Sequence, residues 1–295
     1  MIEWLIGVDG GGSGTRALLQ RRGGSLVGRG EAGPSALGQG IAQAWRHIAS
    51  AVQAAFADAK EPVPPWDRCA LAAGLSGASH PPWREAFVAA NPGFAELEAE
   101  TDAFTMLLGA HGGGAGAILI AGTGSIAEAL RADGSRATVG GWGFPVADEG
   151  SGARLGLHAM RHAQAAMDGR ANVSALARRV WMLCGDDRDS LQSWCGSARQ
   201  FEFAQLARLV FDVEASDPAA AALLQRATEA LEDLALAIDP RGRLPLAVSG
   251  SIGERLMPRM RPALRERVVP ARDGAAAGAL TLIARRVRHS LEEAA

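Results

Sequence analysis

Residues 3–28 read EWLIGVDGGGSGTRALLQRRGGSLVG, and the order of their apolar runs and glycines indicates the fold class. The apolar run Glu3–Val8 predicts a buried strand, and Asp9 and a glycine-rich loop follow it. Thr15–Gln20 is a second strand-like run that ends at a Gly-Gly turn, and a third begins at Ser25. A dinucleotide-binding unit would instead need its glycine loop to open a helix long enough to cross the sheet. The stretch therefore favours a β-hairpin over a Rossmann dehydrogenase fold, which would require the Thr15 segment to be helical.

The same pattern returns about a hundred residues later. Residues 117–121 are apolar and strand-like, a small-residue loop follows at 122–125, and two further runs, 126–131 and 136–139, flank an Asp-Gly turn. Two such units indicate an internal duplication, and 295 residues suffice for two domains. We therefore predict domains at 1–112 and 113–295, with the last helix packing back toward the first domain as an option.

The rest of the chain is predicted from apolar periodicity. Helices are expected at 41–60, 81–90, 103–110, 154–167, 174–183, 203–215, 218–238 and 275–288, and strands at 68–75, 97–101 and 244–248. Strands that alternate with helices predict an α/β protein.

The composition excludes several classes. A net charge of −2 offers no basic footprint for nucleic acid. Lys60 is the only lysine and has no glycine-rich loop beside it, which excludes P-loop NTPases and the protein-kinase pattern. Cys69, Cys184 and Cys195 form no CxxC pair, so neither a zinc site nor a disulfide framework is expected.

The ends of the chain and its apolar stretches indicate a cytoplasmic protein without membrane segments. The N-terminus has no basic region and reaches Asp9 after too short an apolar run for a signal peptide. Residues 103–127 lack Asp, Glu, Lys and Arg but are interrupted by His111 and by glycines at 112–114, 116, 122 and 124, so they predict separate elements rather than a span.

Both glycine loops are candidates for phosphate binding. Glycine turns after buried strands expose backbone N–H groups that can form an anion-binding nest. Ser13, Thr15, Thr123 and Ser125 add hydroxyl groups. The alternative is that the glycines only mark turns.

Two aspartates end strand-like runs. Asp9 could hold a hydrated Mg²⁺ beside phosphates or could be an Asx-turn residue. Asp102 could be a catalytic base at the mouth of a cleft or the N-cap of the helix that follows.

The segment 140–152 combines two aromatic residues, two acids and several glycines, which suits sugar hydroxyls and a sugar ring face. The alternative is a rigid loop with a buried Trp142. His158 and His162 lie four residues apart on the next predicted helix, but without the glutamate of HExxH we expect a solvated face rather than a metal site.

Three stretches, GVDGGGSGTRALL (7–19), LIAGTGSIAEAL (119–130) and GGWGFPVADEGSGARLG (140–156), carry a family likeness. With them the chain resembles the N-acetylglucosamine/glucosamine kinase branch of the BadF/BadG/BcrA/BcrD ATPases, within the actin-like, hexokinase-like, Hsp70-like superfamily. The resemblance spans nearly the whole chain, and the bacterial glucosamine kinases look most similar. It implies two RNase H-like domains, each a mixed sheet flanked by helices, with the active site in the cleft between them.

The resemblance also implies roles for individual residues. Asp102 matches the catalytic base and a sugar ligand, and Asp9 matches the Mg²⁺ position. The first phosphate motif would be Gly10, Gly11, Gly12, Ser13, Gly14 and Thr15, and the second Gly122, Thr123, Gly124 and Ser125. Gly140, Gly141, Trp142 and Asp148 would contact the sugar, and Gly250 and Ser251 the adenosine.

The implied reaction moves the γ-phosphate of ATP to the 6-hydroxyl of glucosamine or N-acetylglucosamine. One departure concerns the sugar: Ala36 stands where the family usually has an asparagine. N-acetylmuramic acid and glucose therefore stay open as acceptors. A redox activator ATPase, which needs clustered cysteines, and a non-catalytic sensor are the rival functions. A homodimer, the commonest oligomer, is also left open.

Overall fold

The computed structural model describes residues 1–293, which divide into two compact units. Unit 1 comprises Met1–Gly116 and the described part of Pro270–Ala295, and unit 2 comprises Ala117–Val269. The predicted domains were 1–112 and 113–295, with the last helix packing back toward the first domain as an option, and in the structure the C-terminal helix α11 (Ala275–Glu293) belongs to unit 1. It packs there against the sheet and against α3 (Asp102–Ala110).

Unit 1 is built on a five-stranded sheet in the order β3-β2-β1-β4-β5. Its strands are β1 Trp4–Gly10, β2 Thr15–Arg21, β3 Leu26–Ala32, β4 Cys69–Leu75 and β5 Glu96–Thr101. The hairpin prediction is confirmed, because β1 and β2 pair antiparallel with Gly10 opposite Thr15. Strand β3 continues the meander antiparallel to β2, whereas β4 and β5 are parallel additions reached through helices. The mixed sheet follows from these two kinds of connection.

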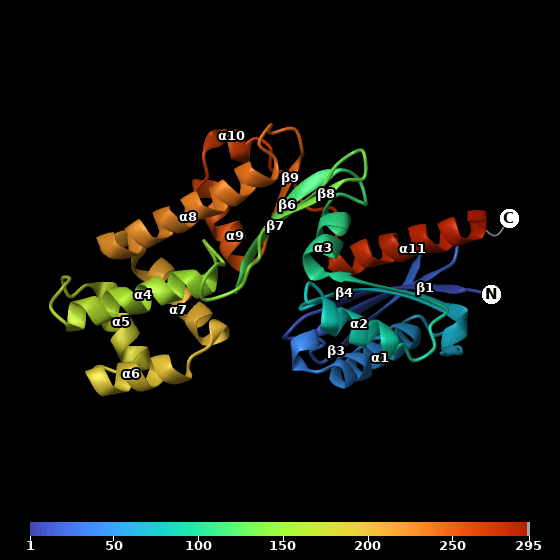
Figure 1. The fold of residues 1–295 in the computed structure, drawn as a ribbon, viewed down its shortest axis with the longest axis horizontal. Helices are drawn as coiled ribbons and strands as arrows, with labels where there is room; N and C mark the ends of the chain where they lie inside the picture. The colour runs from blue at the N-terminus through green and yellow to red at the C-terminus, as the bar shows by residue number, and fades with distance from the viewer. Residues whose placement is uncertain (294–295) are drawn as a thin grey trace. The chain divides into compact units, whose positions relative to one another are not determined.

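Alternating side chains of β1 divide the core of unit 1 between the two faces of the sheet. Trp4, Ile6 and Val8 join a cluster with α1 (Ile41–Asp58), whereas Leu5 joins a cluster with α11. Figure 1 shows these two helices on opposite sides of the strands, with α2 (Pro81–Ala89) near α1. Both faces are therefore covered, which explains why β1 and β4 read as continuous apolar runs.

Gly7 sets how closely α11 approaches the sheet. A Cβ at this position would lie 2.2 Å from the carbonyl oxygen of Ala276 and 2.5 Å from the backbone nitrogen of Leu280. Both atoms belong to the backbone of α11, so no side-chain rotation could make room.

Unit 2 contains a four-stranded sheet in the order β8-β7-β6-β9. The strands are β6 Gly116–Ala121, β7 Ser125–Leu130, β8 Arg136–Gly140 and β9 Leu246–Ser249. Strands β7 and β8 are antiparallel, β6 and β9 are parallel, and a parallel bridge joins Leu246 to Val268. The strand order repeats the first four positions of the sheet in unit 1, as the predicted duplication requires.

Helices make up the remainder of unit 2. They are α4 Gly152–Met167, α5 Ala175–Cys184, α6 Arg188–Ser197, α7 Gln200–Val213, α8 Pro218–Ile238, α9 Ser251–Leu256 and α10 Pro262–Arg265. The sequence did not predict α6, because Leu191 is its only buried residue and no apolar stripe marks it. Figure 1 shows α4, α5, α6 and α7 grouped together, with α8 alongside α4. Within residues 1–293, no helix is both long enough and apolar enough to cross a bilayer.

We predict that Gly7→Ala lowers the free energy of unfolding by about 1–3 kcal/mol, because the new methyl group forces α11 away from β1. Gly196→Ala is the matched control, since a Cβ there would meet nothing within 4 Å and alanine favours its helix. Urea unfolding followed by circular dichroism measures both. Equal stability of the two variants would contradict the assigned packing of α11.

Candidate functional site

The first glycine loop joins β1 to β2 and holds its carbonyl groups against unit 1. The Gly10 carbonyl accepts a hydrogen bond from the Ser76 N–H, and the Gly11 carbonyl accepts one from the Ser35 N–H. Within residues 1–293, no acceptor is found for the N–H groups of Gly12 and Ser13. These two N–H groups are therefore available to donate hydrogen bonds to a bound anion, as in an anion-binding nest.

Thr15, predicted as a phosphate ligand, is buried, and its hydroxyl group contacts other residues of unit 1. Its Oγ1 lies 2.6 Å from the Gly33 carbonyl oxygen and 2.7 Å from Ser35 Oγ. These contacts tie the glycine loop to the segment 33–38, which contains Ala36. In this arrangement Thr15 shapes the loop, and Ser13 is the exposed hydroxyl.

The second glycine loop, between β6 and β7, repeats the arrangement in unit 2. The carbonyl groups of Gly122 and Thr123 accept hydrogen bonds from the N–H groups of Gly152 and Ala153, in the first turn of α4. Among the described residues, the N–H groups of Thr123 and Gly124 have no acceptor. Ser125 is buried, and its hydroxyl donates to the Glu149 carbonyl at 2.7 Å, so its side chain is structural here.

The candidate adenosine motif lies against this second loop. Gly250 joins β9 to α9 with a φ of +87°, and a Cβ there would lie 2.4 Å from the Ala121 carbonyl oxygen. Only glycine combines that left-handed conformation with so close an approach. The neighbouring Ser251 is exposed. Unit 2 thus brings together the second candidate phosphate loop and the candidate adenosine motif.

Asp9 lies within β1 and is not a turn residue, which removes the Asx-turn alternative. It pairs across the hairpin with Arg16, whose Nη1 is 3.7 Å from Asp9 Oδ2. Burial raises the pKa of Asp9, Arg16 opposes that rise, and the negative charge of Asp102 adds to it. The two aspartates of unit 1 therefore influence each other electrostatically.

Asp102 is the first residue of α3 but not its N-cap. Thr101 fills that role, with its Oγ1 accepting a hydrogen bond from the Phe104 N–H at 3.1 Å. The carboxylate of Asp102 accepts from the N–H of Ala103 at 2.9 Å, and burial raises its pKa. A partly desolvated carboxylate at a helix start suits a proton acceptor better than a cap that Thr101 already supplies.

The predicted sugar loop, residues 140–152, has an exposed tip and a buried acid. Trp142 is 88% exposed, which contradicts the alternative of a buried tryptophan. Gly140 and Gly141, with φ of +76° and +72°, carry the chain from β8 into the loop. Asp148 is 4% exposed and has a φ of +64°, a conformation uncommon for residues other than glycine. An exposed aromatic plate and a buried carboxylate therefore belong to the same loop.

Both carboxylate oxygens of Asp148 are held. Oδ1 accepts from the Ser125 N–H at 3.3 Å, and Oδ2 accepts from Gln200 Nε2 at 2.7 Å. Burial raises the pKa of this carboxyl, although the Ser125 N–H favours its charged form. Gln200 could not be predicted from the sequence as a site residue, because a glutamine at the start of a helix carries no motif. Only the packing of α7 brings it to Asp148.

The described residues fit Mg²⁺ bound together with phosphates rather than a protein-only metal centre. Within residues 1–293, no group of three His, Cys, Asp or Glu side chains could hold an ion. Mg²⁺ keeps several waters and needs only one or two carboxylates when phosphates supply the other ligands, and Asp9 could serve as one. The three cysteines form no disulfide, Cys69 belongs to unit 1 and the other two to unit 2, and burial raises the pKa of Cys69 to about 12 and that of Cys184 to about 11. Buried thiols of this kind are poor cluster ligands.

Comparison with known proteins places these features in a family. Residues 6–269 match the BadF/BadG/BcrA/BcrD ATPase family. The chain is 30% identical to glucosamine kinase GspK of Vibrio cholerae over 291 residues, 98% of each chain. It is 45% identical to a solved structure from Chromobacterium violaceum, named provisionally as an N-acetylglucosamine kinase, with a TM-score of 0.90 over 96% of this chain and 99% of that one.

A more distant structure shares the fold alone. A Porphyromonas gingivalis protein, also provisionally named an N-acetylglucosamine kinase, is 19% identical, with a TM-score of 0.63 over 97% of this chain and 100% of that one. Since the family match covers most of the sequence and the relatives align over nearly their full lengths, the chain belongs to the BadF/BadG/BcrA/BcrD ATPase family.

Proposed function

We propose that the protein is an ATP-dependent amino-sugar kinase that transfers the γ-phosphate of ATP to the 6-hydroxyl of glucosamine or N-acetylglucosamine. The observation that carries the proposal is the full-length likeness to two proteins named as kinases of these sugars. The free N–H groups of the two glycine loops and the partly desolvated Asp102 support it independently.

In this proposal each glycine loop acts as a phosphate-binding element of its own unit. The donors are the N–H groups of Gly12 and Ser13 in unit 1 and those of Thr123 and Gly124 in unit 2. Gly250 and Ser251 contact the adenosine, and the close approach of Gly250 to the start of the second loop supports this assignment. Mg²⁺ would be held by the phosphates and by Asp9, directly or through water, and would neutralise charge on the transferred group. Positioning and charge stabilisation then supply most of the catalysis.

Asp102 accepts the proton of the sugar hydroxyl as that oxygen attacks phosphorus. Its raised pKa brings the carboxylate closer to the basicity that a general base needs. Asp148 accepts hydrogen bonds from other sugar hydroxyls, and Trp142, Gly140 and Gly141 lie beside the ring. Gln200 is a positioning residue, since it holds Asp148 Oδ2 and so fixes the direction of the carboxylate.

Replacing Asp102 by asparagine tests the assigned base. We expect Asp102→Asn to lower kcat by about 10²–10⁴-fold, because the amide cannot accept the proton. ATP binding, measured by calorimetry, should persist. The control is Asp133→Asn, an exposed carboxylate in the turn before β8. An Asp102→Asn enzyme with the kcat of the unaltered protein would exclude Asp102 as the base.

Gln200→Leu tests the positioning of Asp148. Loss of the 2.7 Å hydrogen bond frees the carboxylate to rotate, so we expect KM for the sugar to rise about tenfold while KM for ATP stays unchanged. The matched control is Gln225→Leu, since Gln225 bonds Glu229 on the exposed face of α8. Equal sugar KM values in the two variants would mean that Gln200 has no part in sugar binding.

The substrate is tested by ADP release from Mg·ATP in the presence of glucosamine, N-acetylglucosamine, N-acetylmuramic acid or glucose, with a control that lacks sugar. We expect one of the two amino sugars to give a kcat/KM well above those of the other acceptors. A preference for N-acetylmuramic acid or glucose would correct the acceptor, and Ala36 would be the first residue to examine. A rate of ADP release that is the same with and without each sugar would favour an activator ATPase, and sugar binding without turnover would favour a sensor.

A further inference from the structure

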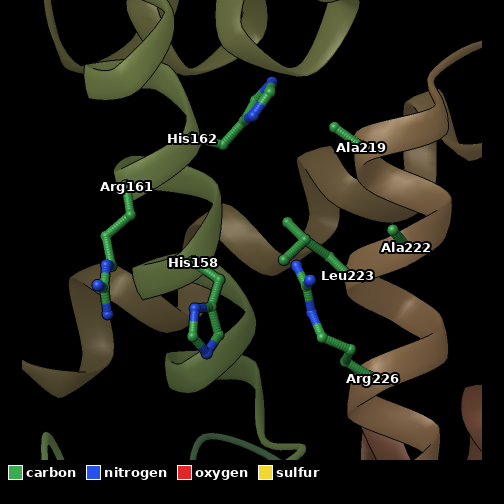
Figure 2. A pocket seen from close by; sticks show the side chains of 7 residues that line it. All are labelled: His158, Arg161, His162, Ala219, Ala222, Leu223 and Arg226. Carbon is green, nitrogen blue, oxygen red and sulfur yellow. The ribbon is translucent and has the colours of Figure 1, made fainter. Parts of the chain in front are cut away.

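A pocket of about 390 Å³ lies between α4 and α8 of unit 2, apart from the loops described above. Its α4 wall is formed by His158, Arg161 and His162, and its α8 wall by Leu223, Arg226 and two alanines. Figure 2 shows the two histidines projecting from α4 toward α8, and Arg226 reaching back from α8 toward α4. The size is that of a small-molecule site.

The lining is basic and contains no carboxylate. Four of its seven side chains carry ring or guanidinium nitrogens. In the part of the chain that the structure describes, neither Arg161 nor Arg226 forms an ion pair. Burial lowers the pKa of His158, and the positive charges of Arg154, Arg226 and Arg161 lower it further. The basic side chains therefore repel one another, and no carboxylate in the lining of this pocket neutralises their charge.

A smaller space of about 150 Å³ shares His158, Leu223 and Arg226 with this pocket and extends it toward the loop 140–152. Arg154 and Glu149 line this extension, and Glu149 is its only carboxylate. Arg154 Nη1 donates to the Pro145 carbonyl at 2.5 Å, so the basic wall touches the candidate sugar loop.

The other acid near the pocket is already engaged. His162 Nε2 lies 2.9 Å from Ser174 Oγ, and the side chain of Asp217 is hydrogen-bonded to Ser174. Asp217 is buried and accepts from the N–H groups of Leu176 at 2.6 Å and Ala219 at 2.9 Å. Its carboxylate thus caps α8 and is held by the start of α5, and it does not neutralise Arg226 or Arg161.

A metal ion does not explain the cluster, because guanidinium groups are always charged and are not metal ligands. Arginine forks and histidine N–H groups instead suit phosphate oxygens. The pocket is larger than a bare phosphate needs, and Leu223 with its neighbouring alanines offers an apolar wall for an organic body. We propose that the pocket between α4 and α8 is a binding site for a small phosphomonoester, whose phosphate is held by Arg226, His158 and the flanking arginines.

Calorimetry on the intact protein tests this site with glucose 6-phosphate and with inorganic phosphate as probes. Saturating concentrations of a non-hydrolysable ATP analogue and of glucosamine occupy the proposed catalytic site, so that neither probe binds there. We expect glucose 6-phosphate to bind more tightly than inorganic phosphate. Arg226→Met and His158→Gln should each weaken binding about tenfold or more, since each removes a donor to a charged acceptor.

Arg179→Met is the matched control, because Arg179 is exposed on α5 and does not line the pocket. We expect no change in affinity for this variant. Absence of binding to the unaltered protein, or binding that Arg226→Met and His158→Gln leave unchanged, would overturn the proposal. Equal affinity for glucose 6-phosphate and inorganic phosphate would overturn the claim that the site also binds the organic part of a phosphomonoester. Because no turnover is measured, failure here is distinct from failure of the proposed kinase activity.

A second readout is the pKa of His158, which is measured by NMR in the presence and in the absence of sodium sulfate. Sulfate stays dianionic from pH 5 to 9. Arg154, Arg161 and His162 face His158 from α4, Arg226 faces it from α8, and Glu149 lines the adjoining space. A bound dianion favours the imidazolium, so the pKa of His158 should rise. A pKa that sulfate leaves unchanged in the unaltered protein, or raises equally in Arg226→Met, would contradict the site.

Discussion

The candidate site depends on one constraint. Both glycine loops bond carbonyl groups to the rest of the unit, and each leaves two N–H groups, those of Gly12 and Ser13 or of Thr123 and Gly124, without an acceptor among residues 1–293. In unit 1 the neighbouring segments bind the carbonyls of Gly10 and Gly11, and in unit 2 the first turn of α4 binds those of Gly122 and Thr123. Each loop closes an antiparallel hairpin or joins adjacent strands, which fixes the direction of its backbone. The proposed recognition of phosphate by backbone groups would account for a chain with one lysine that belongs to a family of ATPases.

Close glycine contacts hold the surrounding elements in place. Gly7 lets α11 lie on the sheet of unit 1, and Gly250 lets the start of α9 lie on the second loop. The carboxylates are positioned in a different way. Thr101 caps α3 and leaves Asp102 as a partly desolvated acid, whereas Ser125 and Gln200 hold Asp148 from two sides. Burial raises the pKa of both acids, which is a common feature of functional sites.

The sequence predicts the hairpins, the succession of strands, loop and turn in the repeated unit, and most helices, because short apolar runs and glycine turns are local signals. It does not predict α6, which lacks an apolar stripe, or the contact of Gln200 with Asp148 across 52 residues. It also could not choose between cap and base for Asp102, because that choice depends on the side-chain conformation of Thr101. His158 and His162 were expected on a solvated face, and the basic pocket they line requires α8, which is distant in sequence.

The most direct test of the account follows the phosphoryl group itself. The protein is incubated with Mg²⁺, ATP and glucosamine or N-acetylglucosamine, and the products are separated and examined by ³¹P and ¹H NMR. The proposed phosphate-binding loops and general base predict that the γ-phosphorus of ATP is transferred to the sugar, where ³¹P couples to the protons at carbon 6. Release of the γ-phosphate only as inorganic phosphate, at the same rate with and without sugar, would contradict the central claim.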